Sequence, residues 1–185
     1  MPATTLDPRT ALVLVDLQKG ILALPSAVHP ADDVLRRGAR LAAAWRERGL
    51  PVVLVRVAGS APGRCEAPPR GGAPAPDFAD LAPELDRREG DIVVTKHTWG
   101  AFHGTDLDLQ LRRRGVTQVV LAGIATSAGV ESTARAAHEH GYHVTVVTDA
   151  VTDPDAQAHR VAVEVIFPRL AETDTTDNVL ALLER

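Results

Sequence analysis

The chain has 185 residues, of which 45% are hydrophobic and only 3% aromatic, and its formal net charge is -4. This length and apolar content suit a single domain, residues 1–185, with an aliphatic core. No basic block with interleaved aromatic residues occurs, which excludes a nucleic-acid surface and favours a small-molecule partner. The first residues are polar and no apolar run approaches the roughly 18 residues that span a bilayer, so we expect a cytoplasmic protein without a membrane segment.

Apolar runs alternate with helical patterns along the chain. Strands are predicted at 11–18, 51–57, 91–96, 117–123 and 143–150, with a short sixth strand around 170–173. Helices are predicted within 31–49, over 105–114, 127–140 and 155–167, and from residue 176 onward. Thr105 is the expected N-cap of the second helix, with Asp108 completing a capping-box-like start. The alternation predicts a Rossmann-like three-layer α/β/α sandwich with a mostly parallel sheet of about six strands.

A segment rich in proline and glycine, residues 59–76, interrupts this alternation. A loop of this length either covers a site as a lid or is an ordinary surface loop exposed to solvent, and the sequence supports both interpretations about equally. It contains the only cysteine, Cys65, which cannot form an intramolecular disulfide and is most simply a loop thiol. The histidines show no recognised metal-ligand spacing with a carboxylate, so neither a metal nor another cofactor is expected.

Three strand ends carry residues capable of chemistry. Asp16 ends the apolar run of the first strand, Lys96 ends the third, and the turn at 125–129 follows the fourth. Because functional groups gather at the carboxyl ends of parallel strands, we expect these residues to meet. A buried carboxylate beside a lysine forms an ion pair whose pKa values depend on burial and on each other. Singly, Asp16 is better explained as a turn cap and Lys96 as a surface residue, but the combination at three strand ends favours a site.

The turn itself lies in GIATSAGVES, residues 123–132. It matches neither the dinucleotide-binding G-x-G-x-x-G pattern nor the nucleophile-bearing G-x-S-x-G pattern. In the simplest interpretation Thr126 or Ser127 is an N-cap and Glu131 favourably occupies the first helical turn. The functional alternative is a helix N-terminus whose amides hold an oxyanion or a carboxylate.

The three segments together resemble the isochorismatase-like hydrolases, also called the cysteine hydrolase superfamily. The resemblance covers nearly the whole chain through ALVLVDLQKG, VVTKHTWGAFHGTDLDLQLRRRGV and VVLAGIATSAGVESTARAAHEHGYHVTVVTDAV. Most members use an aspartate, a lysine and a cysteine nucleophile. The resemblance places Asp16 and Lys96 in the first two roles and Gly129 at the position of the cysteine.

The resemblance also implies a non-proline cis peptide between Ile124 and Ala125 and an oxyanion hole formed by the amides of Ala125 and Gly129. True isochorismatases likewise carry glycine there and hydrolyse an enol ether without a covalent intermediate. In that reaction the aspartate is the general acid, which burial of Asp16 favours and Lys96 opposes. The Asp-x-His motif of metal-dependent nicotinamidases is missing from VRVAGSAPG. Assembly as a homo-oligomer, a dimer or larger, is a further implication.

The leading hypothesis is therefore a cysteine-independent hydrolase of a small molecule, an enol ether or a related compound. Asp16 is the general acid or base, Lys96 orients it, and water is the nucleophile. Trp99 and Phe102 are expected to line the pocket, unless they serve only in ordinary packing. The alternatives are an amide hydrolase that uses water and an inactive binding or assembly module that retains the fold. Nucleotide binding is disfavoured because no glycine-rich phosphate loop is present.

Overall fold

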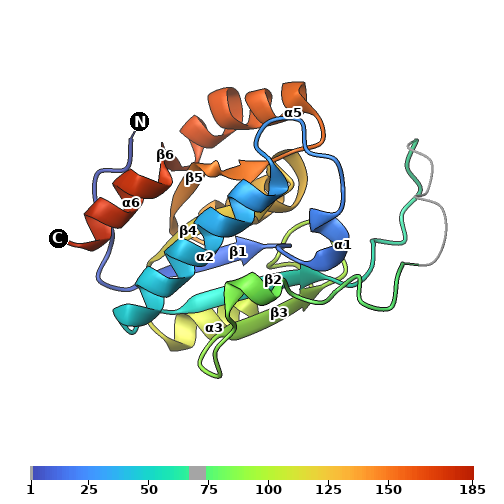
Figure 1. Cartoon of the computed structure of the whole chain (residues 1–185). Helices are drawn as coiled ribbons and strands as arrows, with labels where there is room; N and C mark the ends of the chain where they lie inside the picture. Colours follow the sequence, from blue (N-terminus) through green and yellow to red (C-terminus); the bar gives the residue numbers. More distant parts are fainter. Residues whose placement is uncertain (1, 67–73) are drawn as a thin grey trace.

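A computed structural model describes residues 2–66 and 74–185 (Figure 1). Six strands form one sheet in the order β3-β2-β1-β4-β5-β6, with every neighbouring pair parallel. They are β1 (Thr10–Val15), β2 (Val52–Val57), β3 (Ile92–Lys96), β4 (Gln118–Ile124), β5 (His143–Thr152) and β6 (Glu172–Asp174). The predicted sixth strand is thus confirmed, and the sheet is parallel throughout rather than mostly parallel.

Helices cover both faces of this sheet. The α-helices are α1 (Lys19–Leu22), α2 (Ala31–Glu47), α3 (Leu107–Arg113), α4 (Glu131–Glu139), α5 (Ala156–Val161) and α6 (Thr176–Leu183). One apolar cluster joins the sheet to α2 and α6, and the other joins it to α3, α4 and the segment after α5. Figure 1 shows α2 lying across one face of the sheet. The predicted three-layer α/β/α sandwich is therefore confirmed.

The first strand shows why the sequence forms a central strand. Its side chains alternate between the two clusters, with Leu12 and Leu14 on one face and Val13 and Val15 on the other. All of them are buried, because a parallel strand inside a sandwich has no face exposed to water. This explains the continuous apolar run that predicted the strand.

The strand order places β1 and β4 side by side where the chain reverses its direction of progress across the sheet. From β1 the chain proceeds to β2 and β3 on one side, and from β4 it proceeds to β5 and β6 on the other. Gly123 in β4 has a φ of 124°, and a Cβ there would lie 2.1 Å from the carbonyl oxygen of Val15. Ligands of open α/β sheets bind outside the carboxyl ends of the strands at such a switch point.

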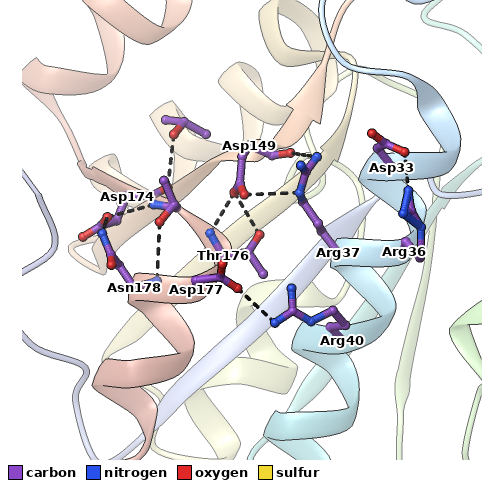
Figure 2. Close-up of polar contacts among 11 residues, drawn as sticks. Asp33, Arg36, Arg37, Arg40, Asp149, Asp174, Thr176, Asp177 and Asn178 are labelled. Carbon is purple, nitrogen blue, oxygen red and sulfur yellow. Dashed lines mark hydrogen bonds and ion pairs between the residues drawn. The ribbon is translucent and has the colours of Figure 1, made fainter.

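The C-terminal helix is fastened to the sheet and to α2 through Asp149 of β5 (Figure 2). The Oδ1 atom of Asp149 accepts hydrogen bonds from the amide and the hydroxyl of Thr176, at 2.7 and 2.8 Å. Its Oδ2 lies 3.2 Å from Nε of Arg37, which also donates from Nη1 to the Asp149 carbonyl. One carboxylate therefore joins α2, β5 and α6.

Several local expectations need correction. The helix predicted from 127 begins with a π-helical turn, η2 (Thr126–Val130), and neither Thr126 nor Ser127 caps it. The second predicted helix begins at Leu107, and its N-cap is Asp106 instead of the predicted Thr105. The Thr105 hydroxyl accepts a hydrogen bond from the Leu107 amide, whereas the Asp108 carboxylate accepts from Arg112 and Tyr142 and completes no capping box.

The strand β5 continues two residues further than predicted, to Thr152. The short helix α1 and a 3₁₀ turn, η1 (Pro83–Leu85), carry no periodic pattern in the sequence and were not predicted. Residues 67–73 of the 59–76 loop lie outside the described residues, and the flanking stretches 59–66 and 74–76 are exposed. None of the helices described here combines the length and the apolar character needed to cross a membrane.

Candidate active site

Asp16 directly follows β1 and is 5% exposed. Its backbone has a φ of 54°, a left-handed conformation that aspartate adopts more readily than most side chains. Its amide donates to the carbonyl oxygen of Val55 at 2.9 Å, so the residue remains attached to β2 although the strand has ended. The carboxylate is thus held by strand hydrogen bonding on a rigid part of the fold.

Lys96, the last residue of β3, is 2% exposed and directs its ammonium group to Asp16. The Nζ atom lies 2.7 Å from Oδ2 of Asp16 and donates a second hydrogen bond to the carbonyl oxygen of Thr98 at 3.1 Å. Since β2 lies between β1 and β3, the two strands are about 10 Å apart. A lysine side chain is long enough to cross that gap, which explains why this type of cation serves at the position.

Burial decides the ionisation of Asp16 against the pull of Lys96. Desolvation is the largest effect and raises the pKa of the Asp16 carboxyl to about 6, although the charge and hydrogen bond of Lys96 lower it. The Oδ2 atom binds Lys96, whereas Oδ1 is buried without a hydrogen-bond partner among the described residues. A carboxyl group with one oxygen held by a cation and the other unpaired is suited to give or take a proton at Oδ1.

The turn η2 follows β4 and faces this ion pair. The peptide bond between Ile124 and Ala125 is cis. The amides of Ala128 and Val130 both donate to the Ala125 carbonyl oxygen at 3.1 Å. Over the described residues, the amides of Ala125 and Gly129 make no hydrogen bond to a group outside the turn.

Gly129 lies against the carboxylate. A Cβ at this position would be 3.3 Å from Oδ2 of Asp16 and 3.0 Å from Cγ1 of Val15. A side chain here would therefore begin in contact with the Asp16–Lys96 pair. The geometry brings the three predicted strand ends together at one point.

Two buried side chains that the sequence did not single out fix this turn. Asp153, just after β5, accepts from the amide and the hydroxyl of Ser127 at 2.7 and 2.8 Å. Thr133 of α4 donates to the Gly129 carbonyl oxygen at 2.6 Å and accepts from the amide of Ala101 at 3.0 Å. Asp153 offered a signal, since it is a carboxylate at a strand end like Asp16. Thr133 offered none, because a threonine inside a helical pattern has no distinctive spacing.

The two aromatic residues predicted to line the pocket differ in their exposure to solvent. Trp99 is 69% exposed, in the segment just after Lys96. Phe102 is buried in the core, with its ring centroid 5.1 Å from that of His140 and 6.0 Å from that of Tyr142. Those partners precede β5 and lie at the amino end of the sheet, so Phe102 serves in packing instead of lining the Asp16 site.

Among residues 2–66 and 74–185, histidine, cysteine, aspartate and glutamate side chains form no group of three that could hold a metal ion. The charged groups that the structure brings together here are Asp16 and Lys96. A carboxyl group beside an ammonium group is chemically able to transfer protons.

Comparison with known proteins agrees with this architecture. The isochorismatase domain model matches residues 10–178. The isochorismatase family protein YecD of Escherichia coli O157:H7 is 43% identical over 94% of this chain and 96% of its own. An isochorismatase family protein of Burkholderia thailandensis has 46% identity and a TM-score of 0.93, covering 98% of both chains.

Relatives with named activities are more distant. The ureidoacrylate amidohydrolase RutB of Methylobacterium radiotolerans is 31% identical over 97% of this chain and 83% of its own. The phenazine biosynthesis protein PhzD of Pseudomonas fluorescens is 30% identical over 95% of this chain and 87% of its own. The N-carbamoylsarcosine amidase of Thermoplasma acidophilum has 28% identity and a TM-score of 0.75, covering 91% of this chain and 97% of its own. The chain belongs to the isochorismatase family and is a hydrolase of that fold.

Proposed function

We propose that the protein hydrolyses a small molecule without a cysteine nucleophile, with Asp16 as general acid and water as the attacking group. The substrate class is an enol ether or a related compound. In this proposal Gly129 occupies the position of the cysteine found in other family members. The observation that carries it is the buried carboxyl of Asp16, bound to Lys96 through Oδ2 and unpaired at Oδ1.

The protonation of Asp16 supports the general-acid role. With its pKa raised to about 6 by burial, about half of the carboxyl carries a proton at pH 6. An ordinary aspartate, with a pKa near 3.9, would hold almost none there. Because Oδ2 faces the Lys96 ammonium, the proton belongs on Oδ1, which has no hydrogen-bond partner among residues 2–66 and 74–185.

The proposed reaction begins with transfer of this proton to the terminal methylene carbon of the enol ether. The substrate becomes an oxocarbenium ion, and water adds to its cationic carbon while releasing a proton to the Asp16 carboxylate. The resulting hemiketal collapses to a ketone and an alcohol. Lys96 stabilises the carboxylate that exists between the two proton transfers, because its Nζ lies 2.7 Å from Oδ2.

The turn η2 supplies the second half of the proposed site. Its amides at Ala125 and Gly129 are the candidates for holding a substrate carboxylate or developing negative charge. Glycine at 129 places no side chain against Oδ2, where a Cβ would lie 3.3 Å away. In this proposal the substrate meets both the amides and the carboxyl group on this side of the turn.

A second candidate is hydrolysis of a carbon–nitrogen bond by water. It is favoured by the similarity to RutB and to the N-carbamoylsarcosine amidase. In that reaction Asp16 would be the base that deprotonates water, so the same residue would act in its ionised form.

A binding or assembly module without activity is the third candidate. It gives no reason to retain a buried ion pair, whose desolvation is costly.

A substrate panel tests the proposal. Wild type and Asp16→Asn are assayed with enolpyruvyl ethers, primary amides, ureido compounds and esters, with product formation followed by NMR. We expect wild type to turn over enol ethers and the variant to lose at least about 100-fold in kcat, because asparagine cannot transfer the proton. Lys19→Ala, which removes an exposed lysine bound to Asp77 and Asp80, is the matched control and should retain activity. Unchanged turnover in Asp16→Asn would refute the role of this carboxyl, and turnover of amides alone would establish the second candidate.

A further inference from the structure

A buried histidine on α5 contacts the first residue of the turn η2. His159 is 9% exposed, and its Nδ1 lies 2.9 Å from the hydroxyl oxygen of Thr126. Thr126 is fully buried and is the first residue of η2, directly after Ala125. This is the only hydrogen bond that the Thr126 side chain makes within the described part of the chain.

The state of the imidazole suits this contact. Burial, reinforced by the nearby His29, lowers the pKa of His159 below its usual range, and Asp153 only partly opposes the effect. The ring is therefore neutral near pH 7. With its proton on Nε2, Nδ1 accepts the hydrogen of the Thr126 hydroxyl, and the geometry of the pair is fixed.

The same region also holds the neighbouring residue of the turn. Asp153 binds both the amide and the hydroxyl of Ser127. The His29 ring packs edge-on against the His159 ring with centroids 6.1 Å apart, and the His29 amide donates to the Thr152 hydroxyl. Thus the segment from the end of β5 into α5 forms hydrogen bonds with Thr126 and Ser127, two successive residues of η2. The loop before α2 contacts this segment in turn through His29.

From these contacts we infer that His159 is a positioning residue, which through Thr126 orients the amides of Ala125 and Gly129 toward the substrate. The inference rests on the proposed function only for the identity of what the amides bind. Without the hydrogen bond, the Thr126 hydroxyl would be buried and unpaired, and the turn would shift to satisfy it. A displacement of even 1 Å at a catalytic group is known to cost as much as about 100-fold in rate.

The test compares Thr126→Val and His159→Leu, which remove the hydrogen bond at nearly constant volume, with Thr126→Ser and His159→Asn. Asparagine places an oxygen acceptor close to the position of Nδ1. With a substrate identified by the panel, we expect the first pair to lower kcat by about 10- to 100-fold while KM changes less than about threefold. The second pair should recover most of the rate. The double variant Thr126→Val with His159→Leu should be no slower than the slower single variant, because both remove one interaction.

The control is His138→Leu, which changes an exposed histidine on α4 and should leave kcat at the wild-type value. The inference would be overturned if Thr126→Ser and His159→Asn lost as much kcat as Thr126→Val. A rise in KM with kcat unchanged would overturn it as well. If wild type turns over nothing in the panel, the proposed function fails. The positioning role is then judged from the ¹H–¹⁵N signals of Ala125 and Gly129. The chemical shifts of these signals should change in Thr126→Val and His159→Leu and should return to the wild-type values in His159→Asn. Unchanged chemical shifts in the first two variants would refute the positioning role.

Discussion

At the scale of single residues, the site depends on a competition for the proton of Asp16. Desolvation alone would make the carboxyl a weak acid, whereas an adjacent ammonium group alone would make it a strong one. In this structure burial prevails, and the pKa rises to about 6. A side chain that is half protonated near that pH can serve as an acid below it and as a base above it.

This competition predicts how activity depends on pH. If Asp16 is the general acid, kcat/KM should fall as the pH rises through about 6, because the protonated form disappears. If Asp16 is the base of an amide hydrolase, kcat/KM should instead rise over the same interval. Initial rates between pH 4.5 and 8.5 distinguish the two mechanisms, and a profile that is flat across this range would contradict both.

The same titration has a consequence for stability that needs no substrate. The pKa of Asp16 is higher in the folded chain than its ordinary value of 3.8, so the folded state binds more protons at intermediate pH. The associated stabilisation is complete below about pH 4 and is lost as the pH rises through about 6, and it amounts to about 3 kcal/mol. In urea unfolding, the free energy of unfolding of wild type should fall by this amount relative to that of Asp16→Asn as the pH rises from about 4 to above 6. If the free energies of the two proteins changed in parallel with pH, the raised pKa would be refuted.

At the scale of elements, the turn η2 is the part of the site that the sequence described least well. The pattern of 127–140 predicts a helix, but it gives no sign that the helix begins with a π-helical turn. The turn is fixed by groups distant in sequence, namely Asp153 on Ser127 and Thr133 on Gly129. Asp16 and Lys96 were found more easily, because each ends an apolar strand and the carboxyl ends of parallel strands share one edge.

A cysteine placed in this turn tests whether its geometry still suits a nucleophile. In Gly129→Cys the new Cβ would lie 3.3 Å from Oδ2 of Asp16, the oxygen that binds Lys96. The thiol would therefore start beside the ion pair, where the carboxylate is a base for its proton and the ammonium group favours the thiolate. The contact of 3.0 Å with Val15 requires a shift of a few tenths of an ångström, and we expect it to cost about 1–2 kcal/mol.

We expect Gly129→Cys to form an adduct with an aliphatic nitrile, detected as an added mass in the intact protein. The exposed thiol of Cys65 is removed first by Cys65→Ser, and that single variant is the control. The rate of adduct formation in Gly129→Cys is compared with the rate at the exposed Cys65 of wild type. If the first rate is no higher than the second, the turn does not activate a nucleophile.

At the scale of the whole molecule, the fold was predictable because its signals are local and repeated. Each strand is a short apolar run, each long helix has an apolar stripe, and the alternation allows few topologies other than a parallel sandwich. Phe102 shows where this reasoning ends, because an apolar residue near a site in sequence packs equally well into the core. The position of α6 was likewise not predictable, since it depends on a carboxylate in β5 that meets residues from two helices.

That carboxylate, Asp149, adds a polar link between α2, α6 and the sheet to their apolar packing (Figure 2). Asp149→Ala would leave the amide and hydroxyl of Thr176 and the guanidinium of Arg37 without this acceptor. Because these groups are largely shielded from water, we expect the free energy of unfolding in urea to fall by about 2–4 kcal/mol. The matched control is Asp177→Ala on the same helix. Asp177 pairs with Arg40, and both side chains are more than half exposed, so its loss should cost less than about 1 kcal/mol. Equal losses in the two variants would show that α6 is held by apolar packing, through residues such as Val179, and that its polar contacts are incidental.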